Sequence, residues 1–119
     1  MTATALPTAL RAAAEGLYAL EAATGLIIAH GTWLPRDDFA RFIHHGAGTA
    51  AIDWEAAISA LNAGALPSSA GKGRMLRLAA SLARDIPVGL GEAVTGIDDR
   101  NVALLVNAIR HACGQHQFR

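Results

Sequence analysis

The sequence predicts an all-α fold, a compact orthogonal bundle of five helices around a central apolar helix at residues 69–84. Three observations predict it. More than a fifth of the 119 residues are alanine, the residue with the highest helix propensity. Apolar residues recur at steps of three and four, as on the buried side of a helix. Hydrophobic residues make up 52% of the chain and charged residues 17%, which favours one folded domain over residues 1–119.

The first helix is predicted over residues 6–29, where apolar residues recur with helical spacing. Gly16 and Gly25 interrupt it, and each costs about 1 kcal/mol relative to alanine in a helix interior. We therefore expect another helix to pack closely against these glycines. Gly31 follows the helix and suits a C-terminal cap.

The second helix is predicted over residues 35–45. Pro35 suits its first turn, where a missing N–H has no cost. Asp37 and Asp38 suit the positive end of the helix dipole. The following segment, residues 45–51, is rich in glycine and alanine and is predicted to be a mobile loop.

The third helix and the central helix each follow a residue that favours the N-cap position. Asp53 is expected to cap the third helix, which closes at Gly64. Ser69 is expected to open the central helix over residues 69–84, and Pro87 prevents its continuation.

The C-terminal part of the chain is predicted to hold a short helical turn at residues 90–95 and one long helix. Asp98 or Asp99 caps this last helix, which runs to Cys113, and residues 115–119 form a frayed tail. Its expected core stripe is Val102, Leu105, Val106 and Ile109.

A narrow basic stripe runs along one side of the central helix. In one interpretation it contacts an anion or nucleic acid, with the third and central helices arranged loosely like a helix-turn-helix. In the other, the arginines lie over the core and pair with carboxylates. The residues concerned are Lys72, Arg74, Arg77 and Arg84.

Aromatic residues make up only 5% of the chain, so each one matters to packing. Four of them are predicted to serve as core anchors or as an exposed interface: Trp33, Phe39, Phe42 and Trp54.

The formal net charge is zero, so the whole molecule has no long-range attraction to nucleic acid or anionic lipid. Zero charge also weakens repulsion between copies, which favours self-association. The single Cys113 excludes an internal disulfide and suits a reducing cytosol. We expect no membrane span, because no apolar run reaches ~18–20 residues, and no signal peptide.

A phosphate-binding loop is the nearest cofactor motif, and the match fails. That loop has four residues between its glycines and a hydroxyl after its lysine. Here six residues separate Gly64 from Gly71, and Gly73 follows Lys72 in place of the hydroxyl. We therefore expect no cofactor.

A metal site is not expected either. His111, Cys113 and His116 straddle a helix end and a tail, without the paired spacing of zinc ligands. The dipole at a helix C-terminus explains His45 and His111 more simply.

Catalytic residues are not predicted. Glu21 lies beside the buried stripe of the first helix, and we expect it to pair with an Arg or His from another helix. An enzyme using His44 or His45 would need a pocket with a histidine and a carboxylate within hydrogen-bond distance. The remaining candidate acids stand where helices start and are interpreted as caps: Asp37, Asp38, Asp98 and Asp99.

Three segments of the chain resemble small uncharacterised helical proteins of high-GC bacteria. They are AAIDWEAAISALNAG (50–64), LPSSAGKGRMLRLAASLA (66–83) and PVGLGEAVTGIDDRNVALLVNAIRHACG (87–114). The resemblance implies an intracellular bacterial protein and no particular activity. The sequence therefore predicts a non-enzymatic cytoplasmic interaction or regulatory protein, whose partner is another protein or a second copy. The alternative is a DNA-binding regulator that uses the basic stripe.

Overall fold

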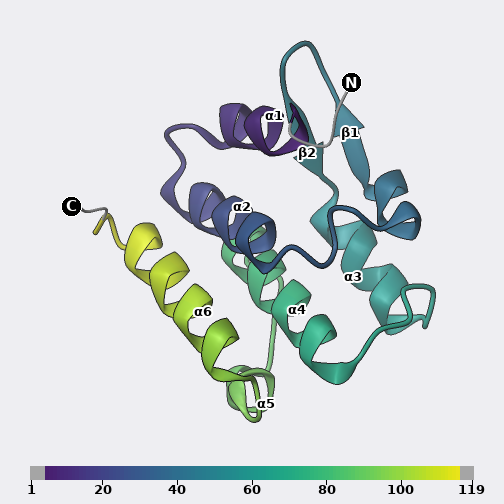
Figure 1. Ribbon diagram of the computed structural model, residues 1–119, viewed down its shortest axis with the longest axis vertical. Coiled ribbons are helices and arrows are strands. Elements are labelled where there is room, and N and C mark those ends of the chain that lie inside the picture. Colours follow the sequence, from purple (N-terminus) through teal and green to yellow (C-terminus); the bar gives the residue numbers. More distant parts are fainter. Residues whose placement is uncertain (1–4, 116–119) are drawn as a thin grey trace.

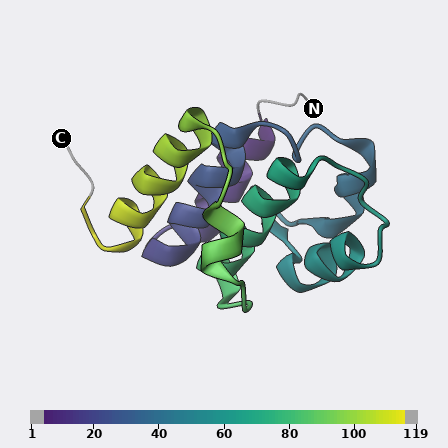
Figure 2. The ribbon, with the colours of Figure 1, turned by 90° about the horizontal axis from the view of Figure 1, so that it is seen from below.

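The computed structural model describes residues 5–115, and its three longest helices lie side by side (Figure 1). They are α2 (Tyr18–His30), α4 (Ala70–Arg84) and α6 (Asp99–Ala112). Figure 2 shows α2 between α6 and α4. Arg100 at the start of α6 donates to the carbonyl of Ala29, while His111 near its end contacts Glu21 near the start of α2. The helices α2 and α6 are therefore antiparallel.

The helix α4 also runs antiparallel to α2. The Trp33 indole, just after α2, donates from Nε1 to the carbonyl oxygen of Lys72 at the start of α4, over 3.0 Å. The predicted orthogonal arrangement is therefore wrong for these three helices. The predicted central helix exists with nearly the expected bounds, but the central position belongs to α2, which packs against α1, α4 and α6.

The first predicted helix is two helices, α1 (Ala5–Ala14) and α2. Gly16 has φ +88°, a left-handed conformation that a continuous helix cannot contain and that glycine adopts without strain. Gly25 lies inside α2, and a Cβ built there would meet nothing within 4 Å. The expected close packing against these two glycines is therefore wrong.

The second predicted helix is a 3-10 helix, η1 (Asp37–Phe42), followed by the strand β1 (Ile43–His45). The predicted mobile loop closes a hairpin, because β1 pairs antiparallel with β2 (Ala50–Ile52). The buried side chains of Ile43 and Ile52 form the pair that joins this hairpin to the core. Residues 5–115 thus hold six α-helices, one 3-10 helix and a two-stranded sheet, so the fold is mostly helical but not all-α.

Three predicted caps are confirmed. The Asp53 carboxylate accepts from the backbone N–H of the third residue of α3 (Trp54–Asn62), Ser69 caps α4, and Asp98 caps α6. A short helix, α5 (Leu90–Val94), connects α4 to α6 as expected. Of the predicted frayed tail, residues 116–119 lie outside the described residues.

The aromatic anchors lie in the core. Trp33 and Phe39 are fully buried, and their ring centroids are 5.7 Å apart. Phe42 packs edge-on against Phe39, and Trp54 is 3% exposed on α3. Of the two roles considered for these side chains, the structure places all four in the interior.

The core stripe predicted for α6 is largely wrong. Leu105 is buried as expected, but Val102, Val106 and Ile109 are 43%, 40% and 46% exposed. Ala108, three residues after Leu105, completes the buried side instead. The helix therefore carries two apolar stripes, and the three exposed residues form the one that does not enter the core.

Candidate functional site

The basic stripe of α4 is partly engaged within the molecule. Arg74 donates from Nη1 to the carbonyl oxygen of Thr95 over 2.7 Å, and Arg84 contacts Glu55 at 3.3 Å. Lys72 and Arg77 form no side-chain hydrogen bond or ion pair with another described residue. DNA binding therefore stays a prediction, and it rests on Lys72 and Arg77. Each contact between a cation and a phosphate supplies only part of the affinity of a protein for DNA.

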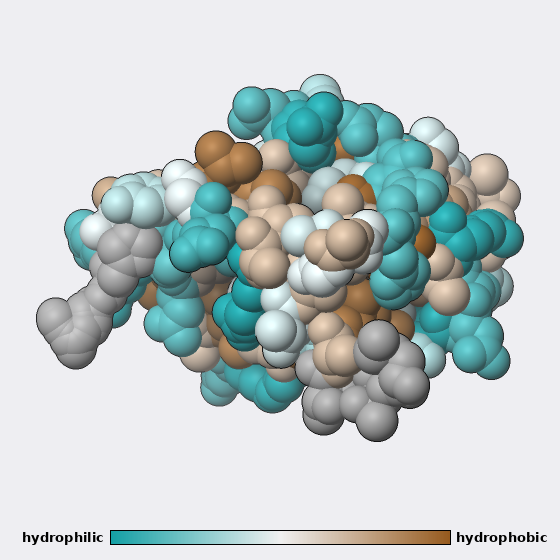
Figure 3. Space-filling model, turned by 90° about the horizontal axis from the view of Figure 1, so that it is seen from above, coloured by the Kyte–Doolittle hydropathy of each residue, from teal (hydrophilic) through white to brown (hydrophobic). Residues whose placement is uncertain are grey.

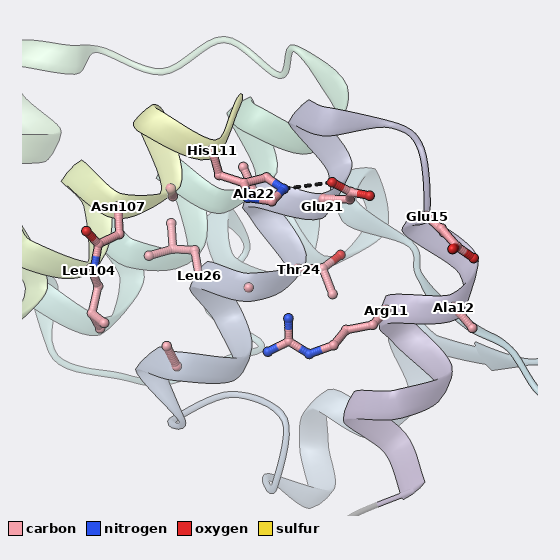
Figure 4. Close-up of a pocket in the computed structure, with 13 residues that line it drawn as sticks. Arg11, Ala12, Glu15, Glu21, Ala22, Thr24, Leu26, Leu104, Asn107 and His111 are labelled. Atoms are coloured by element: carbon pink, nitrogen blue, oxygen red, sulfur yellow. Dashed lines mark hydrogen bonds and ion pairs between the residues drawn. The ribbon is translucent and has the colours of Figure 1, made fainter. Parts of the chain in front are cut away.

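A cleft of about 590 Å³ opens between α1, α2 and α6. This volume is in the range of pockets that hold small molecules. Figure 4 shows Arg11 reaching from α1 toward α2, while Glu15 points away from the centre. The walls formed by α2 and α6 are mostly apolar, with Ala22, Leu26, Leu104 and Ala108, and they also carry the polar Thr24 and Asn107.

At one end of the cleft, side chains of α2 and α6 are in hydrogen-bond contact. Glu21 Oε1 lies 2.7 Å from His111 Nε2 (Figure 4), and its other oxygen accepts the backbone N–H of Gly16. The expected pairing of Glu21 with a basic residue of another helix is confirmed. His111 lies in the last turn of α6, as expected, and this contact also joins the end of α6 to the turn between α1 and α2.

A buried histidine ends α2 at the other end of the molecule. His30 is 9% exposed, and its Nδ1 atom has no hydrogen-bond partner among residues 5–115. Burial lowers the pKa of His30, and the charge of Arg100 lowers it further; Asp98 opposes this with a smaller contribution, and Lys72 lowers the pKa least. The imidazole is therefore neutral at pH 7.

Acid is expected to destabilise the protein through His30. In the unfolded chain its pKa returns to about 6.5, so the unfolded state binds the proton more readily and stability falls as pH drops below that value. The free energy of unfolding, measured in urea over a pH series, should therefore decrease as the pH is lowered. His30→Gln should flatten it, and the exposed His45→Gln should leave it intact. An unchanged slope in His30→Gln would contradict the assignment.

Five large apolar side chains of α5 and α6 are exposed, and the three on α6 share one side of that helix; together the five are called the outer face. Its residues, all exposed, are Leu90, Val94, Val102, Val106 and Ile109. Leu90 and Ile109 also line a groove of about 250 Å³ between α4 and α6. Seen from above in Figure 3, hydrophobic residues lie in small patches among hydrophilic ones.

Charged side chains stand at the two ends of the outer face. Asp99 begins α6 and Arg110 lies near its end, both exposed. Neither side chain bonds another described residue. They are eleven positions apart, about 16 Å along a helix, and share the side that carries Val106.

The other candidate residues do not assemble a site. Within residues 5–115, no three His, Cys, Asp or Glu side chains gather as metal ligands would. His116 lies outside that range. Gly71, Lys72 and Gly73 belong to the first turn of α4 rather than to a loop after a strand.

The histidines of the hairpin do not meet the requirement for acid–base chemistry. His44 Nε2 is 3.8 Å from Asp53 Oδ2, beyond hydrogen-bond length, and both side chains are largely exposed. The Asp53 carboxylate is also engaged in capping α3.

Comparisons with known proteins do not assign the chain to a family. No protein-family model matches the chain, and neither the curated proteins nor the solved structures searched include a match. In the described part of the chain, every helix is too short or too polar to cross a bilayer.

Sequence reasoning missed both the cleft and the outer face. The sequence did contain a signal for the outer face. The apolar residues at 102, 106 and 109 form one stripe at helical spacing, and those at 105 and 108 form a second. Apolar residues on both stripes cover more of a helix than one neighbour can bury. The cleft had no comparable signal except Gly25, a helix-interior glycine without a packing role.

Proposed function

We propose that this chain is a non-enzymatic interaction protein that pairs with a second copy of itself through the outer face. The observation that supports the proposal is the exposure of five large apolar residues on α5 and α6, which water penalises at about 25 cal/mol per Å². Apolar patches of this kind on a small protein mark interaction surfaces. The zero net charge adds no repulsion between copies.

A second copy fits because the charges of α6 are complementary to themselves. If two copies of α6 pack antiparallel about a two-fold axis, Asp99 of each faces Arg110 of the other. The axis then passes beside the middle of the helix, where Val106 of one copy meets Ala103 of the other. Two charged pairs at the rim thus flank an apolar centre, the usual anatomy of a protein interface.

The proposal places the protein in the cytoplasm. Cys113 is an exposed free cysteine near the end of α6, on the same side as Val106 and Ile109. A reducing compartment keeps such a thiol from forming unwanted disulfides between copies.

Light scattering after size-exclusion chromatography tests the pairing. We expect a mass that rises toward twice 12.3 kDa with concentration. Charge reversal tests the geometry: Asp99→Arg or Arg110→Asp alone should weaken pairing about tenfold, because each creates two like-charged contacts. The double variant should restore it.

Two results would overturn the proposal in different ways. A strict monomer at high micromolar concentration would exclude self-association. A dimer that both single reversals leave unchanged, or that the double reversal does not restore, would exclude the antiparallel arrangement of α6. Circular dichroism of each variant verifies that the helices are intact.

A further inference from the structure

We infer that the cleft between α1, α2 and α6 binds a small amphipathic carboxylate, with Arg11 holding the carboxylate and the apolar walls holding the rest. This site does not depend on the proposed pairing. The cleft uses Leu104, Ala108 and His111 of α6, whereas the outer face uses Val102 and Val106.

Arg11 is the charged side chain of the cleft that is available to a ligand. Its acidic groups are not directed at a ligand, because Glu21 is held by His111 and by the backbone of Gly16, and Glu15 points away (Figure 4). Arg11 reaches into the space and forms no hydrogen bond or ion pair with another residue of the described range. A guanidinium presents a planar fork that matches the two oxygens of a carboxylate.

The walls favour an apolar body on that anion. Ala22, Leu26, Leu104 and Ala108 offer no charge, and they lie on α2 and α6, across the cleft from α1, which carries Arg11. A ligand with a charge at one end and a hydrocarbon chain or ring at the other satisfies both sides. A compact, multiply charged anion such as phosphate would leave the apolar walls without contact.

Gly25 gives independent support for an open space. It lies in the interior of α2, where glycine costs about 1 kcal/mol relative to alanine. No atom approaches within 4 Å of the place a Cβ would take, so packing does not require glycine there. Gly25 lines the cleft, and any side chain at this position would occupy ligand space.

Isothermal titration calorimetry of the full chain with octanoate tests the inference. We expect saturable binding of octanoate and none of octylamine or inorganic phosphate. Arg11→Gln should weaken octanoate binding about tenfold or more, the value of a charge-assisted hydrogen bond. Arg77→Gln, the same change at an arginine outside the cleft, should leave it unchanged.

A pair of glycine variants locates the ligand. Gly25→Leu should abolish octanoate binding while keeping or raising the melting temperature, since leucine favours helices. Gly71→Leu is the matched control: Gly71 also lies in a helix with nothing within 4 Å of a built Cβ, but outside the cleft, and binding should persist.

Several results would overturn the inference. These are no saturable binding of octanoate or benzoate up to millimolar concentration, equal binding of octylamine, or full binding by Gly25→Leu. Displacement of octanoate by phosphate alone would show a simple anion site instead. Light scattering on the same samples keeps the result separate from self-association, because Gly25→Leu leaves the outer face unaltered.

Discussion

Replacing Trp33 with alanine is expected to remove most of the folding stability of this protein. Trp33 is fully buried, packs 5.7 Å from the Phe39 ring and donates a hydrogen bond to the carbonyl of Lys72. A buried tryptophan truncated to alanine costs about 3–5 kcal/mol, against a typical total of about 5–15 kcal/mol for a domain. Urea unfolding followed by circular dichroism should show a large decrease in the midpoint.

A second variant separates the contribution of the hydrogen bond from that of the buried ring. Trp33→Phe keeps an aromatic ring beside Phe39 but loses the bond to Lys72, so we expect a smaller loss, with about 1 kcal/mol from the hydrogen bond. Trp54 remains in both variants as a fluorescent reporter of the core. A loss below about 2 kcal/mol in Trp33→Ala would show that the site collapses around the cavity.

Val106→Glu is expected to abolish self-association without unfolding the monomer. Val106 is 40% exposed in the single chain, so a carboxylate there stays in water. In the proposed pair it comes close to the two-fold axis, where two such carboxylates are brought together and desolvated. Like charges in an interface cost several kcal/mol, which corresponds to at least a hundredfold weaker pairing.

The measurement is the concentration dependence of mass by light scattering, with a thermal melt to verify the fold. Ser59→Glu provides the matched control, since Ser59 is exposed on α3, away from the outer face. It should leave pairing unchanged. A dimer that tolerates Val106→Glu would move the interface away from the centre of α6.

The sequence predicted those features that depend on neighbouring residues. The caps at Asp53, Ser69 and Asp98 follow from a short polar side chain that satisfies free N–H groups. The extent of α4 followed from Ser69 and Pro87 in the same way. Even the pairing of Glu21 was predictable in kind, because a carboxylate near a buried stripe needs a partner.

Features that depend on distant residues were not predictable from local pattern. The hairpin of β1 and β2 forms because Ile43 and Ile52 meet across the turn and reach the core together. The position of α2 between α4 and α6 determines which stripe of α6 is buried. Periodicity shows that a helix has an apolar side, but it does not say which of two such sides meets a neighbour.

The cleft is the feature that local sequence patterns predict least. It lies between α1, α2 and α6, and the turn at Gly16 separates the first two of these helices. From the sequence alone, Arg11 is an ordinary exposed cation. The structure gives it a place in the cleft, opposite the apolar walls of α2 and α6.

The central place of α2 has a consequence for how the chain is made. Its last turn is held by Arg100, 71 residues later, and its first turn by His111, 90 residues after Glu21. A ribosome therefore delivers α2 well before the helix that covers one of its sides. Contacts so distant in sequence slow folding, and nascent chains with an uncovered apolar helix are natural clients of chaperones.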